Sequence, residues 1–257
     1  RLHEMYPNFS ERTRTVKEIK SLGKKVSIDG NEYDFVIDCR GYPEDYSNYI
    51  VTDKVYLNSG IVVKSSTPGD WDYTYHIAHK HGWMFGIPLQ KTTGWGYLYN
   101  SDITSELEAQ SNLVDILEEY QVEYLSQNCR EFSFKNYYAK SVMNEDGNIF
   151  VNGNRALFLE PIQATSLGCY GLINEMIIDR IENDVYDNEN YLKIMTEVIA
   201  FINLHYYNGS DFDTPFWNMA KQGARKLFEG RDVSKYDWNH ILDWNLQFRR
   251  QMFDNFL

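Results

Sequence analysis

The spacing of apolar residues separates an early region of short, strand-like runs from a later region with helical periodicity. Val26 and Ile28 alternate with polar residues before Asp29-Gly30, a dipeptide typical of two-residue hairpin turns, so the sequence predicts a hairpin there. The run YDFVIDC at residues 33–39 is almost continuously apolar. That pattern predicts a short strand buried on both faces.

Further strands are predicted on both sides of a helix in the middle of the chain. Residues 54–66 predict a pair of strands around Asn58–Gly60, and residues 72–89 and 94–102 predict two more, joined by QKTTG. The alternating segment 129–143 predicts a strand beyond the helix.

The helix itself begins after Ser105, which has the capping-box spacing to Glu108. Its apolar stripe is predicted to contain Leu107, Leu113, Ile116, Leu117 and Tyr120.

Helical periodicity dominates the last third of the chain. Pro161 is predicted in the first turn of a helix that continues to residue 183, because proline is favoured at that position. Three more helices are predicted over residues 189–207, 214–230 and 237–257. The pattern therefore predicts an α/β (α+β) fold, with a core domain over residues 1–179 and a mainly helical region over residues 180–257.

Composition narrows the class of protein. A chain of 257 residues with 43% hydrophobic and 16% aromatic residues can bury a sizeable core. The net charge of −12 argues against binding nucleic acid, which requires clustered Lys and Arg. The sequence has three cysteines without CxxC spacing, which fits free thiols in a reducing compartment. It has no apolar run of membrane-spanning length and no signal peptide, so we expect a cytoplasmic protein. Because residue 1 is Arg, we expect the chain to begin inside a longer protein.

Three segments could carry chemistry. His76, His79 and His81 lie within six residues, but no further ligand follows at metal-site spacing, so we predict that they bind no metal. In GNRALFLEPIQATS (153–166), a glycine turn leads into a helix whose free N–H groups could face an anion, although an ordinary capped helix fits the pattern as well. In HYYNGSDFDTPFW (205–217), four rings flank a turn and form either a hydrophobic staple or a slot for a planar substrate.

In chain order, four segments resemble successive landmarks of the flavin-dependent tryptophan halogenases. They are YDFVIDCRGY, GWMFGIPLQKTTGWGYLYNSD, GNRALFLEPIQATS and HYYNGSDFDTPFW, spread over residues 33–217. Each segment is weak evidence alone, but the order and spacing of all four make the resemblance specific. It implies the later part of a flavin-monooxygenase-like FAD domain, followed by a mainly helical substrate region. The Asn- and Tyr-rich composition also suggests a phage-encoded member, and hence a viral origin.

The resemblance implies roles for individual residues. The family's WxWxIP segment, a barrier between flavin and substrate, becomes Trp83-Met84-Phe85-Gly86-Ile87-Pro88, with Phe85 in place of the second Trp. The glycines near these rings would let the backbone approach the flavin and neighbouring strands. The family's catalytic Glu falls on Gln163, which cannot accept a proton. Flavin contacts are implied for Gly153, Asn154, Phe158, Leu159, Glu160 and Pro161, halide contacts for Thr165 and Ser166, and substrate contacts for Tyr206, Tyr207, Asp213, Phe216 and Trp217.

Two parts of the family's pattern are missing from the sequence: the GxGxxG flavin fingerprint and the lysine that carries the activated halogen. The resemblance implies a FAD-dependent halogenase that uses reduced FAD from a separate flavin reductase, a halide ion and an electron-rich aromatic substrate, and that forms homo-oligomers. The isolated chain is expected to be incomplete for catalysis. A flavin hydroxylase and a non-catalytic module for aromatic ligands remain the alternatives.

Overall fold

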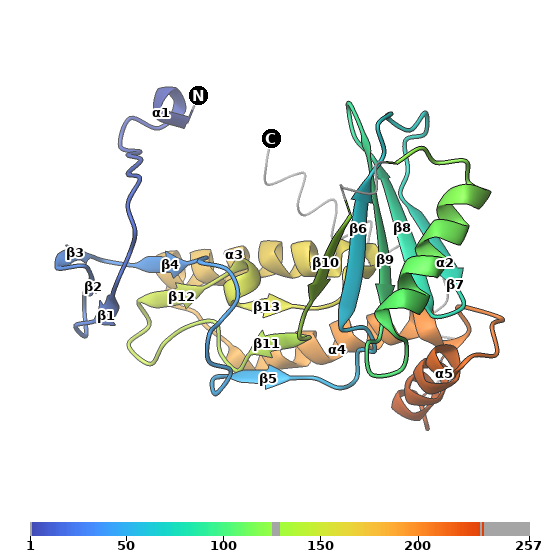
Figure 1. Cartoon of the computed structure of the whole chain (residues 1–257). Helices are drawn as coiled ribbons and strands as arrows, with labels where there is room; N and C mark the ends of the chain where they lie inside the picture. Colours follow the sequence, from blue (N-terminus) through green and yellow to red (C-terminus); the bar gives the residue numbers. More distant parts are fainter. Residues whose placement is uncertain (1, 125–128, 232, 234–257) are drawn as a thin grey trace.

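The computed structural model describes residues 2–124, 129–231 and 233. Its largest sheet has five strands in the order β10-β6-β9-β8-β7, all antiparallel (Figure 1). These strands are β6 (Ser59–Lys64), β7 (Tyr75–His79), β8 (Gly82–Pro88), β9 (Thr93–Tyr99) and β10 (Arg130–Ser133). The predicted strand pair at residues 54–66 is wrong, because only one strand forms there, whereas residues 72–89 form two strands instead of one.

One face of this sheet is covered by α2 (Glu106–Glu119), which begins at the predicted cap. The Ser105 side chain and the Glu108 backbone and carboxylate form a complete capping box. The predicted apolar stripe is partly wrong, because Leu107 is 77% exposed and Tyr120 is 41% exposed. Ala109 and Asn112 are buried on the helix instead.

Three smaller sheets form the rest of the strand structure. They are the meander β1 (Ile19–Ser21), β2 (Val26–Ile28) and β3 (Asn31–Tyr33), the antiparallel sheet β13-β11-β5 with β5 (Tyr49–Val51), β11 (Tyr137–Ala139) and β13 (Leu157–Phe158), and the parallel pair β4 (Val36–Asp38) and β12 (Ile149–Val151). The hairpin at Asp29-Gly30 is confirmed, since both residues adopt positive φ.

The prediction that residues 33–39 are buried on both faces is wrong. Val36 and Asp38 are buried, but Ile37 between them is 47% exposed, so the strand has one covered face. The predicted single strand at 129–143 is also divided, since β10 and β11 belong to different sheets.

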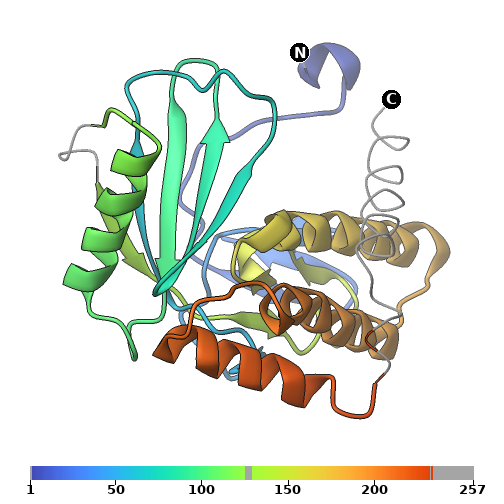
Figure 2. The ribbon, with the colours of Figure 1, turned by 90° about the vertical axis from the view of Figure 1, so that its right-hand side faces the viewer.

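Helices pack together on the second face of the five-stranded sheet, opposite α2 (Figure 2). They are α3 (Thr165–Asn183), α4 (Asn188–Tyr207) and α5 (Pro215–Leu227), with the short helices α1 (Leu2–Met5), η2 (Gly153–Arg155) and η3 (Ile162–Ala164) elsewhere. Pro161 is not in the first turn of α3, because η3 intervenes. The predicted helix at 237–257 lies outside the described residues.

The mixed α/β fold is thus confirmed, and the elements described after Asn183 are helical. Residues 179 and 180 both lie within α3, so the division of the chain there remains a prediction. Among the described helices, none has the length and apolarity needed to span a membrane.

Candidate functional site

Glycines and aromatic rings alternate in β8 and β9 because each glycine faces a ring on the paired strand. The register places Phe85 opposite Gly96 and Gly86 opposite Trp95. A Cβ added to Gly96 would lie 2.2 Å from the Phe85 ring, and one added to Gly86 would lie 2.3 Å from the Trp95 ring. The glycines were expected to let backbone approach the flavin and neighbouring strands, but here they seat the rings of their own sheet.

Three residues from separate sequence motifs meet in a buried hydrogen-bond chain. Trp83 of β8 donates from Nε1 to the Tyr206 hydroxyl over 3.0 Å, and that hydroxyl donates to Oε1 of Glu160 over 2.5 Å. Trp83 is 4%, Tyr206 1% and Glu160 0% exposed. This hydrogen-bond chain therefore joins the aromatic segment on β8, the FLEP segment before α3 and the aromatic turn that begins at the end of α4.

The Glu160 carboxyl is an unusual group for the centre of a core. Burial raises the pKa of Glu160 to about 8, although the hydrogen bond from Tyr206 acts in the opposite direction. The Oε2 atom has no hydrogen-bond partner within the part of the chain that the structure describes. Glu160 is therefore mainly neutral at pH 7, and it anchors Tyr206 as an uncharged acceptor.

A left-handed turn precedes α3, at the segment expected to bind halide. Gln163 has φ 54° and Ala164 has φ 52°, which is an uncommon and strained conformation for two consecutive residues with side chains. Thr165 donates its hydroxyl to the Ile162 carbonyl over 2.6 Å, and the Ser166 hydroxyl bonds to both backbone groups of Leu159. The two hydroxyls thus hold the turn in place.

The N-terminus of α3 has no side-chain cap, because its N-cap residue is Ala164. The Thr165 N–H bonds to the Ile162 carbonyl, but the following N–H groups of the first turn and the positive end of the helix dipole are available to an anion. The Gln163 amide is half-buried and has no hydrogen-bond partner among the described residues.

The residues expected to contact the flavin fall into two groups. Leu159 and Glu160 are enclosed by protein, and their backbone N–H groups bond to Ser166 and Asn136. By contrast, Gly153, Asn154, Phe158 and Pro161 are only half-buried. Gly153 has φ 59°, and the space beside its Cα is open. A flat cofactor could approach the backbone closely at Gly153.

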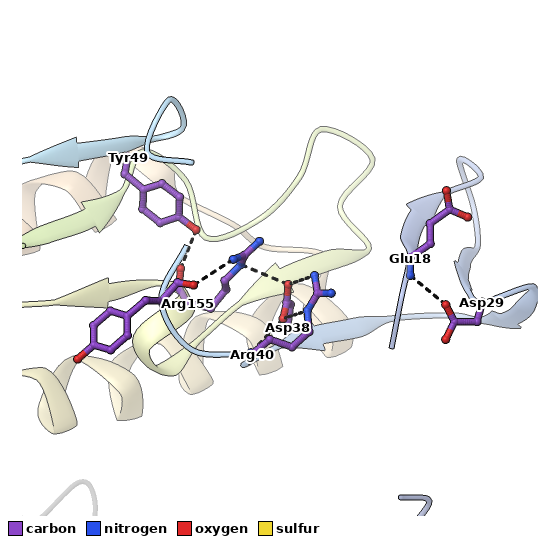
Figure 3. Close-up of polar contacts among 7 residues, drawn as sticks. Glu18, Asp29, Asp38, Arg40, Tyr49 and Arg155 are labelled. Carbon is purple, nitrogen blue, oxygen red and sulfur yellow. Dashed lines mark hydrogen bonds and ion pairs between the residues drawn. The ribbon is translucent and has the colours of Figure 1, made fainter. Parts of the chain in front are cut away.

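An ion-pair cluster around the buried carboxylate of Asp38 was not predicted from the sequence (Figure 3). Asp38 ends β4 and accepts two hydrogen bonds of 2.9 Å from the Arg40 guanidinium, and Nε of Arg155 lies 3.4 Å from its Oδ2. Burial would raise the pKa of Asp38, but the bonds and charge of Arg40, with the charge of Arg155, hold it below its usual value. The sequence signal that could have identified this cluster is a charged residue, Asp38, at the end of an apolar strand. Ligands bind at the carboxyl ends of parallel strands, so such a residue is a candidate for a binding site.

The aromatic turn brings together three of the four expected rings. The Tyr206 ring lies 6.2 Å from Phe216 and 5.8 Å from Trp217, measured between centroids. Phe216 and Trp217 are buried, and Trp217 donates from Nε1 to the His79 carbonyl over 2.6 Å. The expected cluster of four is wrong in one member, since Tyr207 packs against Phe228 instead.

Asp213 of this turn lies at the surface and accepts a hydrogen bond from Asn218. The histidines have other neighbours: the His76 ring lies 5.4 Å from Trp83, and Nδ1 of His79 bonds to the Asn112 side chain. Within the described residues, no group of three His, Cys, Asp or Glu side chains could hold a metal ion. That His76, His79 and His81 bind no metal stays a prediction, to be checked by elemental analysis.

The tryptophan halogenase family model matches residues 12–231. The chain belongs to the flavin-dependent tryptophan halogenase family.

Individual relatives are distant and longer. Tryptophan 7-halogenase RebH of Lentzea aerocolonigenes is 25% identical over 208 residues, which cover 74% of this chain and 38% of the relative. BrvH, a flavin-dependent halogenase from Brevundimonas sp. BAL3, has a similar fold, with a TM-score of 0.65, 21% identity and coverage of 80% of this chain and 46% of that one. Xcc4156, a flavin-dependent halogenase from Xanthomonas campestris, gives a TM-score of 0.63 at 22% identity over 83% and 48% of the two chains. The chain thus spans less than half the length of the proteins that it matches.

Proposed function

We propose that this protein takes part in FAD-dependent electrophilic halogenation of an electron-rich aromatic substrate, of the tryptophan, indole or phenol type. The supporting observation is the buried chain from Trp83 through Tyr206 to Glu160, which joins the motifs expected to separate flavin from substrate, to bind flavin and to hold the substrate. In this proposal, residues 1–179 belong to the flavin core and residues 180–257 form the substrate region.

The residues around Gly153 fit a flat, anionic cofactor. Open space beside Gly153, a half-buried Phe158 ring and the guanidinium of Arg155 could hold parts of FAD. When bound, reduced FAD supplied by a separate reductase would donate two electrons to oxygen and reduce it to the peroxide level, at which it can oxidise halide to hypohalous acid.

The chain's own residues would bind, separate and orient the reactants. The Thr165 N–H is bonded to the Ile162 carbonyl, so halide near Thr165 and Ser166 would be held by the remaining N–H groups of the first turn, at the positive end of α3. Trp83 and Phe85, whose ring centroids lie 6.4 Å apart on one face of β8, would keep the aromatic substrate away from the flavin. Gln163 could hydrogen-bond the substrate or the halogenating agent but could not accept the proton that leaves the ring.

The test is a reductase-coupled assay of the full protein with FAD, NADH, oxygen, and chloride, bromide or iodide in turn. Tryptophan, indole and a phenol serve as substrates, and product masses are measured. Halide-dependent products with the halogen's isotope pattern support the proposal. A product that gains one oxygen whatever the halide would indicate a hydroxylase, and the absence of both products and flavin absorbance would indicate a binding module.

Two variants assign roles within an active protein. Gln163→Glu restores a carboxylate, and because general-base assistance is worth about 10²–10⁴-fold, we expect a clear rise in rate or regioselectivity. Thr165→Val leaves the backbone N–H groups intact, but it removes the hydroxyl that bonds to Ile162, so halide affinity should fall. If neither variant changes a halogenating wild type, the assigned site is wrong although the activity stands.

A further inference from the structure

A second cavity, separate from the proposed site, lies at the edge of the five-stranded sheet near the end of α2. It has a volume of about 470 Å³ and is bordered by four rings, those of Trp71, Tyr75, Trp95 and Tyr120. This volume is within the range of small-molecule sites, which is about 300–1,000 Å³.

The sheet itself separates this cavity from the proposed halogenation site. Trp95 packs with the residues under α2, whereas Trp83 packs in the core formed with α4 and α5. The Phe85 ring covers Gly96 and the Trp95 ring covers Gly86. These two residue pairs are successive in the register, so the two rings lie on opposite faces of the sheet. Figure 2 shows α2 and the helices α3 and α4 on opposite sides of the sheet.

The rings are held in place by one another. Tyr75 lies 5.1 Å from Trp71, 6.2 Å from Trp95 and 5.7 Å from Tyr120, measured between centroids. The Trp71 ring also folds over Gly69, where an added Cβ would come within 2.5 Å of the indole. The aromatic wall is therefore built before a ligand arrives, which lowers the entropy cost of binding.

The charges at the cavity are all negative. Among the residues that the structure describes, Asp70 and Glu123 are its only charged lining residues, both are exposed, and no Lys, Arg or His borders it. Aromatic faces carry negative quadrupole potential, so the rings and the carboxylates favour the same kind of ligand. An anion would be repelled here, in contrast to the α3 N-terminus.

We propose that this cavity binds a small organic cation of the quaternary ammonium class, with its methyl groups against Trp71, Tyr75 and Tyr120, with the buried Trp95 ring behind them, and with its charge facing Asp70 and Glu123. Such cations are recognised by aromatic walls because they are attracted to ring faces and are weakly hydrated. The site is independent of halogenation, and its test does not depend on catalytic activity.

Choline and its neutral isostere 3,3-dimethylbutan-1-ol provide a matched pair of probes, to be titrated into the full protein by calorimetry and ligand-observed NMR. We expect saturable choline binding that is at least about tenfold tighter than binding of the isostere, since a desolvated cation–π contact is worth on the order of a factor of ten. Choline binding should weaken as salt is raised, because the carboxylates are exposed.

Trp71→Leu should weaken choline binding about tenfold, and the double variant Asp70→Asn/Glu123→Gln should weaken it severalfold while leaving the aromatic wall intact. Asp72→Asn is the matched control, because Asp72 is an exposed neighbour that does not line the cavity. Equal affinity for the neutral isostere, no saturable choline binding, or unchanged affinity in correctly folded Trp71→Leu and in the double variant would each overturn the proposal.

Discussion

The buried hydroxyl of Tyr206 offers the sharpest test of how the site is held together. Tyr206→Phe removes one oxygen and keeps the ring, so the packing against Phe216 and Trp217 should change little. The substitution deletes two hydrogen bonds at once, those to Trp83 and Glu160. Both partners are enclosed, so water cannot replace the lost hydroxyl.

The size of the effect follows from these two partners. A buried donor or acceptor that loses its partner costs about 1–3 kcal/mol, so two of them predict a destabilisation of about 2–6 kcal/mol. For a chain of this length, that corresponds to a melting temperature lower by roughly 4–24 °C. Since burial raises the pKa of Glu160 to about 8, the acceptor is neutral at pH 7, and the estimate uses no charged bond.

The measurement is urea and thermal unfolding at pH 7, followed by circular dichroism and tryptophan fluorescence. Tyr207→Phe is the matched control: it removes the same oxygen one residue later, from a half-buried ring with no hydrogen-bond partner in the described part of the chain. Its effect should be within about 0.5 kcal/mol. If Tyr206→Phe were no more destabilising than Tyr207→Phe, the buried hydrogen-bond chain would not stabilise the site as argued.

Three further predictions concern residues of the same core. Glu160→Gln should gain stability relative to the wild type as pH rises from 4.5 to about 8. The reason is that the wild-type carboxyl ionises with a pKa of 4.5 in the unfolded chain but stays neutral up to about pH 8 in the folded protein. If urea melts of the two proteins gave parallel stability–pH profiles, this prediction would be wrong. Asp38→Asn should be less stable than the wild type at pH 7. The difference should shrink as pH falls below 3.8, since the folded Asp38 pKa is lowered and its contribution is lost on protonation. A difference that does not shrink as the pH is lowered below 3.8 would refute this prediction. Gly96→Ala should lower the free energy of unfolding by about 1–3 kcal/mol, because the added Cβ meets the Phe85 ring. Gly94→Ala is its control: a Cβ added there has no atom within 4 Å, so the loss of stability in the same melts should be much smaller.

Local signals in the sequence were sufficient for the elements that depend on neighbouring residues. The Asp29-Gly30 turn and the Ser105–Glu108 cap follow from interactions within four residues, and α5 starts at Pro215, where proline is favoured because of its fixed φ; the structure has each of them. The order of four short motifs also indicated the family, because it records which residue types recur at which spacing and needs no coordinates.

Other features depended on contacts between distant segments. The run at residues 33–39 was predicted to be buried on both faces, but packing covers only one face of β4, and Ile37 on the other face is 47% exposed. The glycines of β8 and β9 suggested close approach to a cofactor until the strand register placed a ring over Gly86 and Gly96. The segments that pack over a strand decide which of its faces is covered, and the register decides which side chains lie opposite one another; neither can be read from the residues of a single strand.

The sequence by itself therefore determined the turns, the caps, most helices and the identity of the aromatic and polar motifs. Only the tertiary structure decided that Trp83, Glu160 and Tyr206 form one buried chain, although 46 residues separate the last two. It also decided that Asp38 pairs with Arg155 and that four rings border a second cavity. The physical reason is that hydrogen bonds, burial and ion pairing act over a few ångströms in space, whatever the distance along the chain.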